Sequence, residues 1–337
     1  MSNPVIAVAL RGDRLESAHR GAGTVVDASG AIVTSFGDIE RPVYPRSAIK
    51  ALQALPLVES GAADRLGLSA KEIALACASH AGEEDHVATA RAMLAKAGRD
   101  ESVLECGAHW PLGEAAARAL ARSGKTPTAL HNNCSGKHAG FVCLACAEGV
   151  DPRGYVAHYH PVQREVAGAI AEVTHARLTE ETRGVDGCSI PTYAIPLRAL
   201  AFGFARFVTG EGLSKGRATA AARIRAAVAA NPATVAGAGR FDTEIMTILG
   251  ARAFTKTGAE GVFCAALPDA GFGIAVKVDD GGARAAQVAI AALMQRFGGF
   301  EEDVRARLAH FVAPRLVNWN GVETGFLRPA GPLAAGP

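Results

Sequence analysis

The fold class is decided by two stretches near the start of the chain, VIAVALRGDR (residues 5–14) and TVVDASGAIVTSF (residues 24–36). Both are short apolar runs that turn-forming residues follow or interrupt, RGDR in the first stretch and DASG in the second. Apolar runs joined through such turns are typical of β-hairpins. The sequence therefore predicts that the chain begins with an antiparallel sheet.

A similar pattern returns near the other end of the chain. GVFCAAL (261–267) and FGIAVKV (272–278) are expected to be strands, and ARAAQVAIAALMQRF (283–297) is expected to be a helix. The alanine-rich middle of the chain has helical periodicity. We therefore predict a mixed α/β fold, in which one antiparallel sheet is built from both ends of the chain, flanked by helices, with an inserted helical subdomain.

These patterns also predict the domain organisation. We expect a single catalytic unit over residues 1–330, with its sheet-containing part at about 1–60 and 240–325. The helical part is expected at about 61–239, and residues 328–337 are expected to form a loose tail.

Composition narrows the class of protein. The chain has 337 residues, of which 49% are hydrophobic and 20% are charged, which is typical of a globular enzyme. Its formal net charge is only +2 and its basic residues are scattered, which argues against a nucleic-acid partner. The N-terminal segment has no basic leader, and no apolar run approaches the length of a membrane span. We therefore expect a cytoplasmic protein that acts on a small molecule, with its seven cysteines reduced.

Ser47 and Lys50 lie three residues apart at the expected start of an apolar helix, RSAIKALQALPLVESGA (46–62). A serine nucleophile needs a neighbouring base, and a lysine serves only when its pKa falls by roughly 3.4 from about 10.4. A second cation about 4 Å away, together with desolvation, supplies such a shift. The start of the helix is also expected to offer backbone N–H groups to an oxyanion. The alternative is a helix cap followed by a solvated lysine.

Lys256 is the candidate for this second cation. It begins a K-T-G triplet beside an expected strand, and Ser79 stands before an expected helix. An S-x-x-K, a second serine and a K-T-G in this order resemble the serine set of β-lactamases and penicillin-binding proteins.

The resemblance to that serine set is incomplete. There is no S-D-N triplet, Asn132 and Asn133 lie well downstream of Ser79, and no glutamate is recognisable that would position a deacylating water. Acyl transfer is therefore favoured over a penicillin-directed activity.

Sulfur and polar side chains gather in two further loop-like stretches, HNNCSGKHAGF (131–141) and GVDGCSIP (184–191). Thiolates of Cys134 and Cys188 can hold a borderline metal such as Zn²⁺. Lys137, His138 or Asp186 can supply a third ligand. Core packing of the two thiols is the alternative.

Five long motifs together resemble the rhizobial-type L-asparaginases, and the likeness extends from about residue 5 to residue 325. The motifs are YPRSAIKALQALPLVESGAADRLGLS (44–69), ASHAGEEDHV (78–87), HNNCSGKHAGF (131–141), GVDGCSIPTYAIPL (184–197) and FTKTGAEGVFCAAL (254–267). This resemblance implies a fold similar to serine β-lactamases and serine-dependent glutaminases, and a homodimer. It implies two catalytic pairs, which match Ser47 with Lys50 and Ser79 with Lys256.

The resemblance also implies a zinc ion that tunes substrate affinity without being essential for the chemical step. Its ligands match Cys134, Lys137 and Cys188.

The function expected from these motifs is hydrolysis of L-asparagine to L-aspartate and ammonia through an acyl-enzyme on Ser47. Arg46, His138 and Asp186 are the candidates for holding the α-carboxylate and α-ammonium groups of the substrate. The alternatives are a glutaminase, a penicillin-type acyl hydrolase, or a zinc-stabilised ligand-binding protein without catalysis. One methylene distinguishes the two amide substrates, which is worth about 1–3 kcal/mol.

Overall fold

The computed structural model of this chain describes residues 2–334. They group into two compact units. The sheet unit comprises residues 1–48, 194–211 and 252–337, and the helical unit comprises residues 49–193 and 212–251. That these units act as a single catalytic unit stays a prediction.

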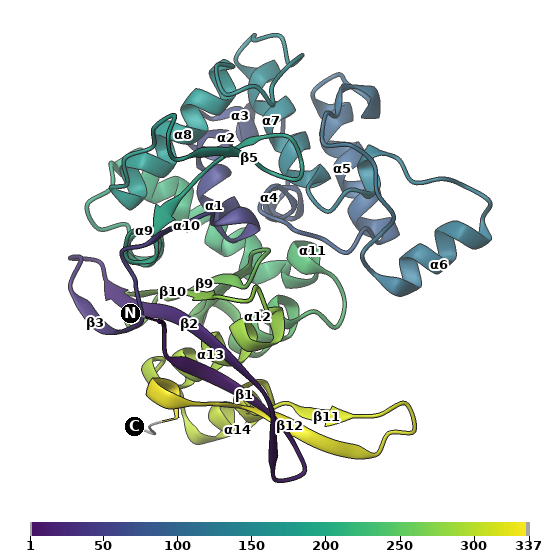
Figure 1. The fold of residues 1–337 in the computed structure, drawn as a ribbon. Coiled ribbons are helices and arrows are strands. Elements are labelled where there is room, and N and C mark those ends of the chain that lie inside the picture. The colour runs from purple at the N-terminus through teal and green to yellow at the C-terminus, as the bar shows by residue number, and fades with distance from the viewer. Residues whose placement is uncertain (1, 335–337) are drawn as a thin grey trace. The chain divides into compact units, whose positions relative to one another are not determined.

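The sheet unit is built on an antiparallel sheet in the order β11-β12-β1-β2-β10-β9-β8, with β3 paired to β2 (Figure 1). Its strands are β1 (Val5–Arg11), β2 (Arg14–Asp27), β3 (Ile32–Phe36), β8 (Phe254–Thr257), β9 (Val262–Leu267), β10 (Phe272–Val278), β11 (Arg315–Val317) and β12 (Glu323–Pro329). A short ribbon pairs β4 (Pro42–Val43) with β7 (Ile195–Pro196). The mixed α/β fold with an antiparallel sheet is confirmed.

Both predicted hairpins are present, and local chemistry explains their turns. Arg11 pairs with Arg14, and the intervening Gly12 has a φ of +54°, which glycine adopts without steric cost. At the second turn the Asp27 carboxylate accepts hydrogen bonds from the backbone N–H groups of Ser29 and Ala31. Aspartate side chains commonly stabilise turns in this way.

Strands from both ends of the chain meet in the sheet. β12 pairs with β1 in a register that places Arg328 opposite Val8 and Gly325 opposite Arg11. The sequence did not reveal β11 and β12 as strands. The expectation of a loose tail over residues 328–337 is wrong for its first part, because residues 328 and 329 end β12 and Gly331–Leu333 form the 3₁₀ turn η5. Residues 335–337 lie outside the described residues.

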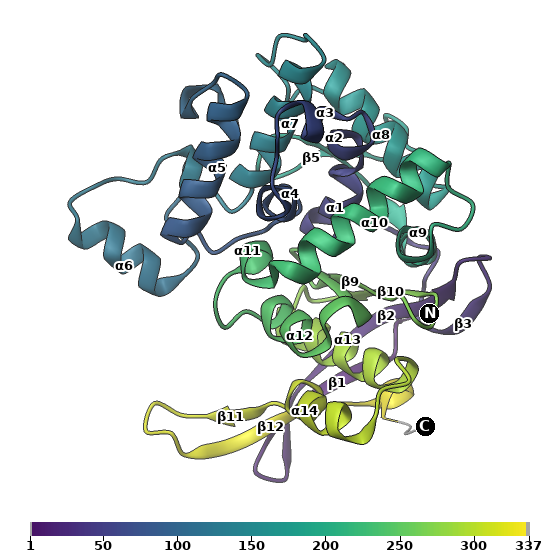
Figure 2. The same ribbon diagram turned by 180° about the vertical axis from the view of Figure 1, so that it is seen from behind.

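Helices cover the sheet within this unit. α9 (Leu197–Thr209) packs against β2, β9 and β10, and it comes so close that a Cβ at Gly273 would lie 1.8 Å from the carbonyl oxygen of Ala201. α13 (Ala283–Phe297) packs against β9, β10, β1 and β12, and α14 (Glu302–Val312) packs on α13 (Figure 2). The core therefore lies between the sheet and these helices.

The helical unit is organised around α7 (Ser135–Ala147), in which residues 135–145 are buried. The other helices of this unit are α1 (Lys50–Gln53), α2 (Leu55–Glu59), α3 (Ala62–Arg65), α4 (Ala70–Ala76), α5 (Glu84–Lys96), α6 (Glu114–Arg122), α8 (Pro161–Thr174), α10 (Lys215–Ala230), α11 (Pro232–Ala236) and α12 (Phe241–Leu249). Short 3₁₀ turns are η2 (Glu101–Val103) and η3 (Ala129–His131), and β5 (Arg183–Val185) pairs with β6 (Pro191–Tyr193). η1 (Arg46–Ile49) and η4 (Gly250–Arg252) lie at the boundaries between the units.

From residue 46 the sequence predicts a helix that stops near Pro56 or at Gly61. The structure has instead a series of short pieces, η1, α1 and α2. Pro56 has no N–H to continue the helical hydrogen bonds of α1, and its ring crowds the preceding turn. Arg46 has a φ of +51°, so regular helix cannot extend back through it. Within residues 2–334, no helix combines the length and apolarity needed to cross a bilayer.

Candidate active site

The ten residues predicted for the site are divided between the two units. Arg46, Ser47 and Lys256 belong to the sheet unit. The other seven belong to the helical unit, and they are Lys50, Ser79, Cys134, Lys137, His138, Asp186 and Cys188.

Ser47 lies in the 3₁₀ turn η1, half-buried, directly after the strained Arg46. A non-glycine residue with positive φ costs of order 1–3 kcal/mol, and such strain clusters at functional sites. The N–H of Ala48 donates to the carbonyl oxygen of Pro45 at 3.1 Å. The N–H of Ala48 is therefore already used, and η1 is a four-residue turn. The expectation that other N–H groups at this turn face an oxyanion stays a prediction.

Lys256 lies on β8 with its side chain fully buried, and its Nζ donates to the carbonyl oxygen of Thr257 at 3.1 Å. Gly258 follows directly. A Cβ at Gly258 would lie 2.8 Å from the carbonyl oxygen of Pro45 and 3.2 Å from Cβ of Ala48. The end of the K-T-G strand and the Ser47 turn are therefore neighbours, and only glycine allows them to approach so closely.

Lys50 has no solvent exposure, and its Nζ donates to the carbonyl oxygen of Ala78 at 2.6 Å and to Cys134 Sγ at 3.1 Å. Burial lowers the pKa of Lys50; the charge of Cys134 opposes this shift, and the ammonium of Lys137 adds to it. The sequence motifs predict Lys256 as the cation that acts on Lys50, and that stays a prediction. Within the helical unit Lys137, predicted only as a metal ligand, also acts on Lys50.

Cys134, Cys188 and Lys137 form a buried cluster with Lys50. Lys137 Nζ donates to Cys188 Sγ at 3.0 Å and also lies 5.8 Å from the centre of the Phe141 ring. The hydrogen bond between the two sulfurs lowers the pKa of Cys134 and raises that of Cys188. Burial acts to lower the pKa of Lys137, but the negative charge of the cysteines outweighs it, so the pKa of Lys137 is raised.

This donor set fits a tetrahedral metal. Zn²⁺ binds sulfur at about 2.3 Å and nitrogen at about 2.0–2.1 Å, which places neighbouring ligand atoms roughly 3.5 Å apart. The 3.0 Å between Lys137 Nζ and Cys188 Sγ is a hydrogen-bond distance, about 0.5 Å shorter than that separation, so these two atoms would move apart to hold the ion. Among residues 2–334 no group of three His, Cys, Asp or Glu side chains is arranged to hold a metal. Lysine as the third ligand stays a prediction.

His138 is fully buried on α7, and its Nδ1 lies 2.7 Å from the hydroxyl oxygen of Tyr155. That hydroxyl also accepts a hydrogen bond from the backbone N–H of Glu105. The other ring nitrogen, Nε2, has no hydrogen-bond partner among the described residues. Burial, followed by the charges of Lys137 and Lys50, lowers the pKa of His138 well below its ordinary value, which keeps the ring neutral. The result is a buried ring nitrogen whose hydrogen-bonding capacity is unused.

Asp186 directly follows β5, at the start of a turn. Ser189, at the end of the same turn, has a φ of +76°. Its carboxylate accepts a hydrogen bond from the N–H of Gly187 at 2.8 Å. Its charge also raises the pKa of Lys137. Asp186 is therefore close to the cysteine–lysine cluster.

Ser79 lies in the loop between α4 and α5, and its N–H donates to the carbonyl oxygen of Val235 at 2.9 Å. Asn133 Nδ2 donates to Ser79 Oγ at 2.8 Å. The backbone N–H of Asn133 donates to His109 Nε2 at 3.0 Å, and His109 Nδ1 lies 2.6 Å from the carbonyl oxygen of Trp110. No asparagine stands next to Ser79 in the sequence. The folded chain brings Asn133 to Ser79 from 54 residues downstream. The Asn-Asn pair before Cys134 is the sequence signal that points to this contact.

Two stacked histidines support the Ser79 loop. His80 stacks on His86 with ring centres 4.8 Å apart. His80 Nδ1 accepts from the N–H of Gly82, and its Nε2 lies 2.9 Å from Ser135 Oγ. Burial, followed by the charges of His86 and Lys50, lowers the pKa of His80 well below its ordinary value. The ring is therefore uncharged and acts as a rigid connector between the Ser79 loop and α7.

Comparison with known proteins bears on this arrangement. Residues 7–329 match the family model described as L-asparaginase II. The chain belongs to the L-asparaginase II family. This membership supports an asparaginase-type amidohydrolase in general. No curated protein matches the chain.

Two solved structures are distantly similar to the L-asparaginase II family member. A β-lactamase from Mycobacterium bovis shares 14% identity with a TM-score of 0.38, over 87% of this chain and 95% of that one. A mutant of simvastatin synthase from Aspergillus terreus shares 11% identity with a TM-score of 0.42, over 86% of this chain and 93% of that one.

Proposed function

We propose that the protein is an L-asparagine amidohydrolase of the rhizobial type, which releases L-aspartate and ammonia through a serine acyl-enzyme. The observation that carries this proposal is the family match over residues 7–329. The buried lysines, the paired cysteines and the Ser79–Asn133 contact support it. The homodimer that the sequence motifs imply is part of the same proposal.

The nucleophile in this proposal is Ser47. Lys50 is three residues farther along the chain, a spacing at which helical side chains are neighbours. In its neutral form Lys50 takes the proton of Ser47 as Oγ attacks the carbon of the side-chain amide of asparagine. A base beside the hydroxyl is what makes a serine nucleophilic at neutral pH. The fully buried environment of Lys50 favours the neutral amine that this step requires.

The second pair, Ser79 and Lys256, protonates the departing ammonia in this proposal. Because Ser79 Oγ accepts a hydrogen bond from Asn133, its own proton is directed away from Asn133. Ser79 therefore passes a proton to the leaving nitrogen and is reprotonated by Lys256. Water then attacks the aspartyl ester on Ser47 and gives its proton to the neutral Lys256, while Lys50 returns a proton to Ser47 Oγ. L-aspartate leaves, and the hydroxyl and both amines are back in their starting states.

Arg46, Asp186 and His138 hold the α-groups of the substrate in this proposal. The guanidinium of Arg46 pairs with the α-carboxylate, and the carboxylate of Asp186 pairs with the α-ammonium. Within the sheet unit Arg46 lines a cavity of about 340 Å³. The Nε2 of His138, unpartnered among the described residues, forms a further hydrogen bond with the substrate, which would remove the cost of leaving a buried polar group unsatisfied.

Cys134, Lys137 and Cys188 are the residues that would hold zinc. When bound, zinc would keep Lys137 as a neutral amine and both sulfurs as thiolates. Its expected influence is on substrate affinity, since the serine–lysine chemistry needs no Lewis acid.

The test is ammonia release from purified protein supplied with L-asparagine, L-glutamine or a chromogenic β-lactam. We expect rapid release from asparagine, slower release from glutamine and no β-lactam hydrolysis. S47A should lose activity by a factor of about 10⁴ or more, as removal of a catalytic nucleophile does. S123A removes an exposed hydroxyl at the end of α6 and is the matched control. Near-normal turnover by S47A would refute Ser47 as the nucleophile, and β-lactam cleavage without ammonia release would refute the amidohydrolase.

A further inference from the structure

A pocket of about 340 Å³ lies within the sheet unit, and side chains of both charges line it. Arg41 and Lys277 bring positive charge, Glu260 and Asp279 bring negative charge, and Leu197 contributes to an apolar wall. Cavities that take small molecules begin at about this volume and combine an apolar wall with a few polar groups. The pocket is therefore suited to a small charged molecule.

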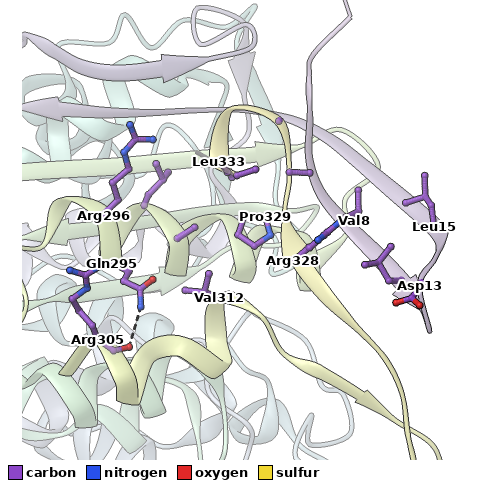
Figure 3. Close-up of a pocket in the computed structure, with 16 residues that line it drawn as sticks. Val8, Asp13, Leu15, Gln295, Arg296, Arg305, Val312, Arg328, Pro329 and Leu333 are labelled. Atoms are coloured by element: carbon purple, nitrogen blue, oxygen red, sulfur yellow. Dashed lines mark hydrogen bonds between the residues drawn. The ribbon is translucent and has the colours of Figure 1, made fainter. Parts of the chain in front are cut away.

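A larger groove of about 910 Å³ in the same unit has a different arrangement of charge. Figure 3 shows Arg296, Arg305 and Arg328 at separate places along this groove, with Asp13 at one end. Its guanidinium groups therefore do not form one binding centre, whereas the charges of the smaller pocket gather around a single lysine.

That lysine is Lys277, which is half-buried at the end of β10. Burial lowers the pKa of its amine; the charges of Asp279 and Glu260 oppose this shift, and the charge of Arg41 adds to it. Lys277 Nζ donates to the carbonyl oxygen of Val278, which uses one of its three N–H groups. A carboxylate bound beside this ammonium would offset the cost of its burial.

Arg41 and Glu260 carry charges that the protein leaves unpaired. Within residues 2–334, neither the guanidinium of Arg41 nor the carboxylate of Glu260 has a hydrogen bond or an ion pair with another side chain. Asp279 differs from them, because its Oδ1 accepts a hydrogen bond from Asn3 Nδ2 at 2.8 Å. The pocket therefore offers two cations, Arg41 and Lys277, and one free carboxylate to a ligand.

The backbone around the pocket is fixed before any ligand binds. Four non-glycine residues of the described chain have a positive φ, and two of them, Arg46 at +51° and Glu260 at +58°, line this pocket. Such strain persists only where the surrounding structure enforces it, and it clusters at ligand sites. Asn3 also fixes the wall, because its Oδ1 accepts from the N–H of Asp38 at 2.8 Å while its Nδ2 donates to Asp279.

We propose that this pocket binds an acidic α-amino acid, of the class of L-aspartate and L-glutamate. The two carboxylates of the ligand pair with Arg41 and Lys277, and its ammonium pairs with Glu260. Such charge-assisted hydrogen bonds are roughly twice as strong as neutral ones. These three residues are not among those proposed to act on the substrate, so the inference does not depend on the proposed asparaginase activity.

The first test is chemical protection of Lys277, because it reports on this pocket alone. The protein is treated briefly with an acetylating reagent, and acetylation of each lysine is measured by mass spectrometry. L-Aspartate at about ten times its dissociation constant should slow acetylation of Lys277 by about 10-fold. Acetylation of Lys125, an exposed lysine of the helical unit, should not change. Lys277 that is acetylated equally fast with and without L-aspartate and L-glutamate would overturn the proposal.

Variants separate this pocket from the proposed substrate site. The concentration of L-aspartate that protects half of Lys277 measures the affinity, and R41A and E260Q should each weaken it by about 10- to 150-fold, the loss typical of a charged hydrogen bond. R14A is the matched control, because Arg14 is an exposed arginine at the start of β2. The melting temperature shows whether each variant is folded. Unchanged affinity in R41A and E260Q would refute the assigned contacts.

D186A removes the carboxylate that the proposed function assigns to the ammonium of the substrate. L-Aspartate should protect Lys277 in D186A as well as in the natural protein. Loss of protection in D186A would show that the amino acid acts from the substrate site, which would overturn the proposal.

A ligand series on the natural protein tests the chemical class without any variant. L-Glutamate keeps all three charges, succinate lacks the ammonium, and L-alanine lacks the second carboxylate. Succinate and L-alanine should each bind at least about 10-fold more weakly than L-aspartate. E260Q should bind succinate at least as well as the natural protein does, because it no longer presents a carboxylate to that dianion. Succinate that protects Lys277 as well as L-aspartate does would identify a plain anion site and overturn the proposal.

Discussion

The contact between Asn133 and Ser79 leads to a sharp prediction about proton direction. Asn133 Nδ2 donates to Ser79 Oγ at 2.8 Å, so Ser79 is the acceptor in this bond, and in the proposed mechanism its own proton goes to the leaving ammonia. Asn133→Ala removes the donor and lets the hydroxyl rotate. Asn133→Asp has nearly the same shape, but its carboxylate only accepts hydrogen bonds and would draw the Ser79 proton toward itself.

The magnitudes follow from the type of bond. A neutral hydrogen bond contributes about 0.5–1.5 kcal/mol, so N133A should lower kcat by about 2- to 13-fold. A hydrogen bond to a charged group is worth about 1.5–3 kcal/mol, so N133D should lower kcat by about 10- to 150-fold. N133D, which has nearly the shape of asparagine, should therefore lose more kcat than N133A. KM should change little, because neither variant removes a group proposed to bind the substrate.

The assay is steady-state ammonia release from L-asparagine at pH 7, with the melting temperature measured for each variant. Asn231→Ala is the control, because Asn231 Nδ2 donates a comparable bond of 2.9 Å to the Ala227 carbonyl at the end of α10. It should lower stability slightly and leave kcat unchanged. If N133D kept more activity than N133A, Ser79 would donate to residue 133, and the proposed proton path through Ser79 would be wrong.

Three further predictions concern the metal cluster and stability. The natural protein should contain about one zinc per chain by elemental analysis, and C134A/C188A should contain none and should show a larger rise in KM than fall in kcat. The control C146A changes a half-buried cysteine and should retain the metal. Natural protein without metal would contradict the predicted zinc site. Burial, together with the hydrogen bond and charge of Glu148, raises the pKa of Glu165 to about 7. Because the folded state disfavours the ionised carboxylate, stability falls as pH rises from about 4.3 to 7, so E165Q should melt about 1–3 °C higher than the natural protein at pH 8 and at the same temperature at pH 4. The expected difference in melting temperature is small because solvent screens the charge of this largely exposed side chain. If E165Q and the natural protein melted at the same temperature at pH 8 as well as at pH 4, Glu165 would ionise normally. Ser69 Oγ accepts a hydrogen bond from the N–H of Glu72, while the Glu72 carboxylate accepts one from the N–H of Ser69. S69A should therefore lower the free energy of unfolding by about 1 kcal/mol, measured as a lower midpoint of urea denaturation at constant slope. An unchanged midpoint would show that this cap contributes nothing to stability.

Features that depend on a few neighbouring residues were predictable. The two N-terminal hairpins follow from turn residues such as Gly12 and Asp27, whose conformations and hydrogen bonds are local. The position of Lys256 on a strand was also correct. The periodicity of EIALACASH (72–80) allows either a buried strand or a buried helix. In the structure its first five residues belong to α4, which begins with a capping box at Ser69.

Features that depend on contacts between distant segments were missed or assigned differently. Pro56 and the strained Arg46 divide the expected helix into short turns. β12 was not recognised, because its pairing partner β1 lies at the other end of the chain. The cation that acts on Lys50 in the helical unit is Lys137, which is 87 positions away in the sequence.

The amino-acid sequence by itself determined the hairpins, the alternation of strand-rich ends with a helical middle, and the residue types available for acyl transfer and metal binding. Only the tertiary structure decided which amine lies beside which thiol, that Asn133 donates to Ser79, and that the Nε2 of His138 is buried without a hydrogen-bond partner among the described residues. The physical reason is range. Turn and helix chemistry acts over a few residues, whereas desolvation and charge–charge interactions act over a few ångströms between groups that only the folded chain brings together.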